Sequence, residues 1–166
     1  MSPITTSASG PRTASGQVDI RGPRFVAFIT TGVLVVVLLL AAVATPAATV
    51  LIAIQAVVFA LGATLGPRLH PYGLIYARLI APRSGPVTET EPAAPLRFAQ
   101  LLGFVFAAVS LLGFLLGTSV VGALFAGFAL FAAFLNAAFG ICLGCKIYPL
   151  VTQLVPRSLS ESPAPN

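Results

Sequence analysis

The stretch FAQLLGFVFAAVSLLGFLLG, residues 98–117, is followed after Thr118 and Ser119 by VVGALFAGFALFAAFLNAAFGI, residues 120–141. Neither stretch contains a charged residue, and each has about the 20 residues that a helix needs to cross a bilayer. Two further apolar runs, at 25–45 and 47–66, share these properties. The sequence therefore predicts an all-α membrane protein, a bundle of four transmembrane helices.

The composition agrees with a lipid environment. Of the 166 residues, 57% are hydrophobic and 8% are charged, and the mean hydropathy is +1.00. Such a chain cannot cover its apolar surface with polar groups in water, so its main partner is the lipid bilayer. The net charge of +5 comes from basic residues scattered singly outside the spans, which is not a nucleic-acid-binding pattern. The absence of ionisable residues within the spans also argues against an ion-coupled pump.

The distribution of basic residues predicts the topology. All nine Lys and Arg residues lie on the side opposite the two short turns that follow the first and third spans. Lys and Arg near span ends are retained in the cytoplasm. We therefore expect a multi-pass protein of the bacterial inner (plasma) membrane, with both termini and the loop at 67–97 in the cytoplasm. Residues 1–17 and 155–166 have the composition of disordered tails, which leaves 18–154 as the membrane domain.

The two halves of the chain resemble each other. Arg24 and Arg97, each followed by Phe, are 73 residues apart, and Gly66 and Gly140 are 74 apart. This spacing predicts two duplicated helical hairpins in parallel orientation. In the middle loop, apolar residues around Arg78 predict a short interfacial cytoplasmic helix. The only histidine, His70, lies just before it and is expected to cap a helix or to face lipid.

The fourth predicted span has one narrow face of small residues. Such a face lets two helices approach closely, and a single amide on it can hydrogen-bond across the contact. We interpret it as a helix-packing seam, with a substrate path as the alternative, and the same seams are compatible with a homo-oligomer. The face consists of Gly122, Ala126, Ala129, Ala133, Asn136 and Gly140.

One tetrapeptide, Cys142-Leu143-Gly144-Cys145, can carry chemistry. This CxxC spacing suits a disulfide, a shared soft metal or a persulfide. A closed zinc site needs four ligands, and two cysteines with one histidine do not supply them, so we predict no metal and no cofactor. The alternative is that both cysteines are small apolar residues packed at a helix end.

The surroundings of the two cysteines bear on their reactivity. At the C-terminal end of the fourth span, the helix dipole would oppose thiolate formation, and Lys146 would offset this effect. In the cytoplasm the pair would be reduced by default. Asp19, Arg21 and Arg24 precede the first span on the same side, where they either tune the thiols or anchor the helix start.

Several motifs together resemble an uncharacterised bacterial membrane family, domain of unknown function 4395, of the actinobacterial type. They are DIRGPRF at 19–25, HPYG at 70–73, RFAQ at 97–100 and FLNAAFGICLGC at 134–145. The family has no established activity to carry over. Because its members tend to be encoded near thioredoxin-like proteins and sulfurtransferases, the resemblance implies a partner of either kind and a thiol or sulfur context for Cys142 and Cys145.

Three functions remain open from the sequence. The first is a thiol or sulfur relay through the cytoplasmic CxxC; the second is a non-enzymatic membrane scaffold or subunit. The third is a carrier of small uncharged solutes, which would have to oligomerise. The relay is similar in outline to the four-helix thiol oxidoreductases that include vitamin K epoxide reductase. The chain lacks their second cysteine pair and their outward-facing cysteines, which argues against a self-contained quinone-linked enzyme.

Overall fold

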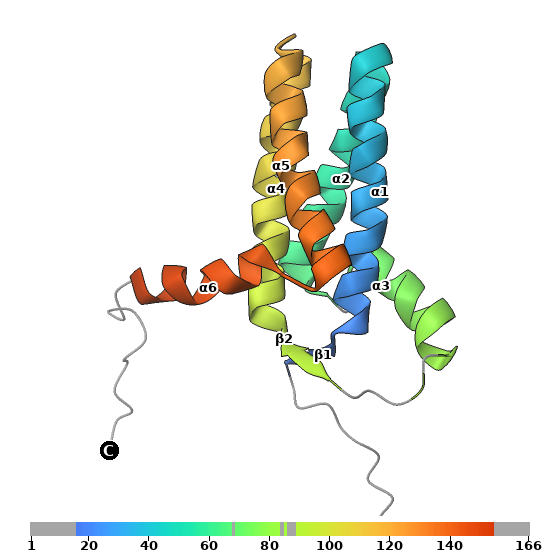
Figure 1. The fold of residues 1–166 in the computed structure, drawn as a ribbon, viewed down its shortest axis with the longest axis vertical. Helices are drawn as coiled ribbons and strands as arrows, with labels where there is room; N and C mark the ends of the chain where they lie inside the picture. Colours follow the sequence, from blue (N-terminus) through green and yellow to red (C-terminus); the bar gives the residue numbers. More distant parts are fainter. Residues whose placement is uncertain (1–15, 68, 84, 86–88, 155–166) are drawn as a thin grey trace, which may run out of the picture.

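The structure is a computed structural model that describes residues 16–67, 69–83, 85 and 89–154. Four long helices stand side by side in it (Figure 1), and each is long and apolar enough to cross a membrane, which confirms the predicted bundle. They are α1 (Arg21–Val43), α2 (Thr45–Leu65), α4 (Ala93–Leu115) and α5 (Ser119–Phe139). The predicted tails fall outside the described residues, except for Gly16 and Gln17.

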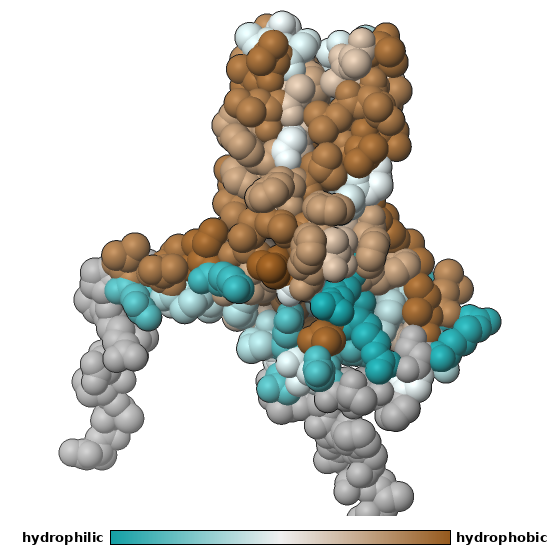
Figure 2. Space-filling view, in the orientation of Figure 1, coloured by the Kyte–Doolittle hydropathy of each residue, from teal (hydrophilic) through white to brown (hydrophobic). Residues whose placement is uncertain are grey.

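The four helices form a closed ring of contacts. α1 packs on α2 and α5, and α4 packs on the same two helices, so the first helices of the two hairpins lie diagonally opposite. Leu34, Ile52, Ala107 and Ala126 are fully buried where the helices meet. The outer surface of the bundle is hydrophobic and the hydrophilic residues gather at one end (Figure 2), as expected for a protein whose solvent is lipid.

Each half of the chain contains the same series of elements. A short strand leads into two long helices, and a shorter helical segment follows them. The shorter elements are β1 (Gln17–Asp19), α3 (Pro71–Ile75), η1 (Tyr76–Ile80) and η2 (Ala81–Arg83) in the first half, and β2 (Thr90–Pro92) and α6 (Leu143–Leu154) in the second. The two strands pair antiparallel, and α3 and η1 pack on α1 as α6 packs on α4. This arrangement is that of two repeats related by a two-fold axis along the bundle.

Matching arginines tie the repeats together. Arg97, in the first turns of α4, donates from Nε to the carbonyl oxygen of Ala63 at 3.2 Å and from Nη2 to that of the next residue, in the last turn of α2. Arg24, near the start of α1, has its guanidinium against Gly140 at the end of α5. A positive charge at a helix C-terminus interacts favourably with the helix dipole. Each arginine therefore stabilises a helix end in the other repeat.

The helices begin earlier than the apolar runs. α1 begins at Arg21 and α4 at Ala93, four or five residues before the predicted spans. The carboxylate of Asp19 accepts a hydrogen bond from the Arg21 backbone N–H at 3.0 Å, which satisfies one free donor of the first turn. Proline is tolerated there because it removes no helical hydrogen bond. The polar first turns therefore extend the helices past the apolar segments.

Candidate functional site

The two cysteines lie where the chain passes from α5 to α6. α5 ends at Phe139, and Gly140 follows in the left-handed conformation with φ of 68°. Glycine adopts this conformation without steric cost, and the backbone N–H groups of Gly140 and Ile141 donate to carbonyls of the last turn of α5. α6 begins at Leu143, and the Lys146 backbone N–H donates to the Cys142 carbonyl at 3.1 Å. Cys142 is thus the N-terminal capping residue of a new helix.

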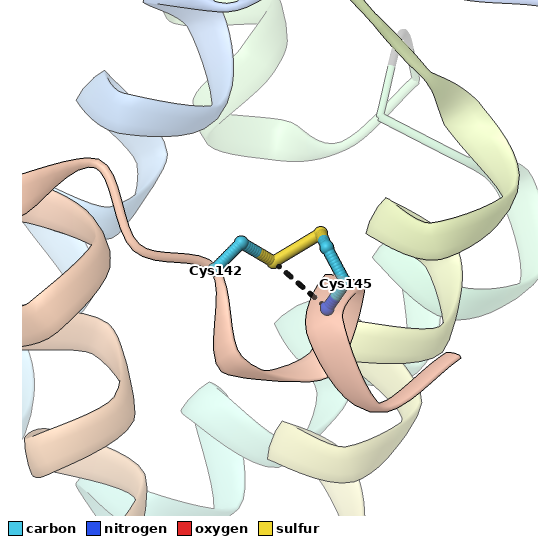
Figure 3. Close-up of a disulfide and its surroundings, with 2 residues drawn as sticks. All are labelled: Cys142 and Cys145. Atoms are coloured by element: carbon cyan, nitrogen blue, oxygen red, sulfur yellow. Dashed lines mark hydrogen bonds between the residues drawn. A yellow bond between two sulfur atoms is a disulfide. The ribbon is translucent and has the colours of Figure 1, made fainter. Parts of the chain in front are cut away.

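Cys142 and Cys145 form a disulfide, with their Cα atoms 5.2 Å apart. The Cys145 backbone N–H donates to Cys142 Sγ at 3.2 Å (Figure 3), so the sulfur takes the place of an N-cap oxygen. The expectation that the helix dipole opposes thiolate formation is wrong, because the chain breaks at Gly140 and places Cys142 at the positive end of α6. A helix N-terminus stabilises a thiolate.

Contacts with α4 fix the position of α6. Gly144 is buried against Ala99, and a Cβ atom on Gly144 would lie 2.6 Å from the Ala99 Cα. The rings of Phe98 and Tyr148 lie 5.8 Å apart. α6 extends sideways from the bundle (Figure 1), with a hydrophobic face toward the apolar body and a hydrophilic face away from it (Figure 2). This is the pattern of a helix lying in a membrane interface.

The charged residues expected near the cysteines occupy different places. Asp19 lines the same cavity as Cys142, and its carboxylate accepts from the Arg21 backbone N–H. Lys146 is exposed on α6. Arg24 covers Gly140 at the end of α5, three residues from the disulfide along the chain numbering of Leu143. Of the predicted supporting residues, only Asp19 shares the cavity wall with Cys142 among the described residues.

A cavity of about 370 Å³ lies beside the disulfide, between the two repeats. Both repeats line it at matching positions: Ala27 and Gln100 are 73 residues apart, and Phe59 and Ala133 are 74 apart. Its walls are mainly apolar, and Cys142 forms part of them. The cavity therefore lies on the axis that relates the repeats, near the end that carries α3 and α6.

Two buried polar groups line this cavity without a partner. His70 is 1% exposed, and neither of its ring nitrogens has a hydrogen-bond partner in the described part of the chain. The same holds for Oε1 of Gln100. Gly62 makes room for both, because a Cβ atom there would lie 2.5 Å from the His70 ring and 3.0 Å from the Gln100 side chain. The expectation that His70 caps a helix with its side chain or faces lipid is wrong.

Burial determines the protonation of this region. Desolvation lowers the pKa of His70 to about 4, so its imidazole is neutral at pH 7. The His70 ring lies 5.3 Å from that of Tyr72, whose hydroxyl donates to Gln55 Oε1 at 3.0 Å. Burial also raises the pKa of the Tyr72 hydroxyl. The cavity thus presents uncharged hydrogen-bonding groups at neutral pH.

A family comparison covers both repeats. Domain of unknown function DUF4395 matches residues 18–153, from β1 to the end of α6. The chain belongs to the DUF4395 family. No curated protein and no solved structure matches the chain. The site of this DUF4395 protein is therefore interpreted from its own geometry.

The small residues of α5 in this DUF4395 protein fall into two groups. Gly122 lies against Gly113 and Phe114 of α4, and Ala126 is fully buried in the core. Ala129, Ala133 and Asn136 line the cavity instead. No group of three or more metal-binding side chains occurs among the described residues of the DUF4395 chain.

The sequence alone does not single out Gln100 as a site residue. Its position is nevertheless encoded in the repeat, because it matches Ala27 on the other side of the axis. In the same way His70 caps α3 where Cys142 caps α6. A comparison of the two repeats residue by residue would have drawn attention to both.

Proposed function

We propose that this DUF4395 protein is a membrane-embedded thiol relay, in which Cys142 and Cys145 exchange a disulfide with a cytoplasmic protein dithiol. The observation that carries the proposal is the position of Cys142 at the N-terminus of α6, with its sulfur accepting the Cys145 backbone N–H. A stabilised thiolate is both the reactive form of a cysteine and a good leaving group.

The exchange follows from this asymmetry. A thiolate of the partner attacks Cys145 Sγ, the disulfide bond breaks, and Cys142 leaves as the thiolate stabilised by α6. The second thiol of the partner then attacks the mixed disulfide, and Cys145 leaves as a thiol after taking up a proton. The partner gains a disulfide, and the CxxC gains two electrons.

The partner is defined by this chemistry. A thioredoxin-like protein presents a suitable dithiol, and a sulfurtransferase would suit a version in which Cys142 carries sulfane sulfur. The membrane is the inner membrane, with both termini and the CxxC in the cytoplasm. The clustering of hydrophilic residues at the end of the bundle that carries α3 and α6 supports this orientation (Figure 2).

The roles of the two cysteines can be tested by alkylation of single variants. In Cys145→Ser the remaining Cys142 thiol is expected to react with iodoacetamide at a lower pH than the Cys145 thiol in Cys142→Ser. The wild-type disulfide is expected to oxidise reduced thioredoxin, and the double serine variant provides the control. Equal reactivity of the two thiols, or no oxidation of thioredoxin by correctly assembled protein, would favour a scaffold instead.

Orientation is tested separately with maleimides in intact cells. A membrane-permeant maleimide is expected to label the cysteines after reduction, whereas an impermeant one is not. Labelling by the impermeant reagent would place the CxxC outside and overturn the proposed cytoplasmic exchange.

A further inference from the structure

We infer that the cavity between the two repeats binds the ring of a membrane quinone, which reoxidises the Cys142–Cys145 dithiol. The redox step rests on the proposed function, whereas the binding site rests on the cavity alone. The cavity volume of about 370 Å³ lies in the range of roughly 300–1,000 Å³ typical of small-molecule sites.

The walls select an uncharged, lipid-soluble occupant. Most lining residues are apolar, and Val26, Phe59 and Phe106 contribute large side chains. Asp19 is the only charged side chain that lines the cavity within the described residues, and it already accepts a backbone hydrogen bond. A charged solute would lose its hydration without gaining a partner there. An apolar ring from the membrane would lose little.

The two unpartnered polar groups give this occupant its oxygens. A neutral imidazole has one N–H donor and one acceptor nitrogen, and the Gln100 Oε1 is an acceptor. A buried polar atom without a partner costs free energy, so a ligand that pairs with it binds more tightly. A quinone carbonyl accepts from the His70 N–H, and a hydroquinone hydroxyl donates to Gln100 Oε1. Both redox forms of the ring therefore find partners in the cavity.

The position of Cys142 supplies the electron donor. His70 at the start of α3 and Cys142 at the start of α6 hold equivalent places in the two repeats, and both line the cavity. The Cys142 thiolate, the Cys145 thiol, one proton from solution and the quinone yield the disulfide and the hydroquinone. Two electrons pass from sulfur to the ring, and each of its oxygens gains a proton. One cysteine pair suffices, because the protein partner supplies the second dithiol.

Binding is tested without redox chemistry in the Cys142→Ser/Cys145→Ser protein in nanodiscs. Equilibrium dialysis with duroquinone and with menadione is expected to show saturable binding. Loss of one hydrogen bond is expected to weaken it about tenfold in Gln100→Leu and in His70→Leu. Gln55→Leu is the matched control, because Gln55 is also fully buried but does not line the cavity. Binding that is non-saturable, or equal in Gln100→Leu and Gln55→Leu, would overturn the site.

The redox step is tested with reduced wild-type protein under anaerobic conditions. Duroquinone is expected to disappear in a one-to-one ratio with dithiol, and Gln100→Leu is expected to slow this reaction while its disulfide still oxidises thioredoxin. If thioredoxin exchange occurs but no quinone reacts, the quinone assignment fails and the thiol relay stands. If quinone binds saturably but the cysteines exchange with no dithiol, the site stands and the relay fails.

Discussion

Protonation of His70 is expected to destabilise the folded bundle as the pH falls below 6.5. The pKa of His70 is about 4 in the folded protein, against 6.5 for an exposed histidine. Between these values the unfolded chain binds one more proton than the folded chain, so the free energy of unfolding rises with pH in this window. Above pH 6.5 both states are neutral at this residue and its contribution is constant. Stability is therefore lost on acidification.

The magnitude follows from the two pKa values. One pH unit between them corresponds to about 1.4 kcal/mol, so the loss from pH 7.5 to pH 5 is about 2 kcal/mol and reaches about 3 kcal/mol near pH 4. For a chain of this length, 2 kcal/mol lowers the midpoint of thermal unfolding by roughly 4–8 °C. His70→Gln keeps a polar side chain but cannot titrate, so it is expected to lack this part of the pH dependence.

Thermal unfolding in detergent, followed by size-exclusion chromatography, measures the effect in both proteins at each pH. The difference between the wild type and His70→Gln removes the contribution of the carboxylates, which titrate in both. The wild-type midpoint is expected to fall more steeply between pH 6.5 and pH 4. Parallel profiles in the two proteins would refute the assignment of a buried, neutral His70, and with it the electrostatic description of the cavity.

Two further perturbations test the packing of the bundle. The Ser110 hydroxyl, fully buried, donates to the Gly122 carbonyl at 2.7 Å, and Ser110→Ala is expected to cost about 0.6–1.7 kcal/mol in thermal unfolding; no loss would show that the α4–α5 contact does not depend on this bond. Gly140→Ala is expected to destabilise more than Gly117→Ala. Both glycines have positive φ, but only Gly140 has a neighbour, the Arg24 guanidinium, where the methyl group would be. Equal losses would contradict the arginine contact.

The four spans could be predicted because each is a local property of the sequence. An uncharged apolar run of about 20 residues must satisfy its backbone hydrogen bonds internally in lipid, and a helix does so from its own residues. The repeat was also legible, since Arg24 and Arg97 recur at a fixed spacing. The strands were not predicted, because each has three residues and exists only through pairing with the other.

The chemistry of the candidate site could be predicted only in part. The CxxC identifies two sulfur atoms, but not which helix end they occupy. Gly140 breaks the chain under the Arg24 guanidinium from the other repeat, so the reversal of the local dipole at Cys142 depends on a contact between residues far apart in sequence. α6 was missed for a related reason, because its Pro149 and its polar face do not resemble a membrane span.

The sequence by itself determined a lipid-soluble, four-helix, duplicated chain with one pair of thiols, because hydropathy, spacing and cysteine count are properties of the residues in order. Only the tertiary structure decided that His70 and Gln100 are buried together around Gly62, and that Cys142 shares their cavity. These residues come from four different segments, and only the close packing of the two repeats brings them to one place. Burial then removes their water, which makes the histidine neutral and leaves its nitrogens available to a ligand.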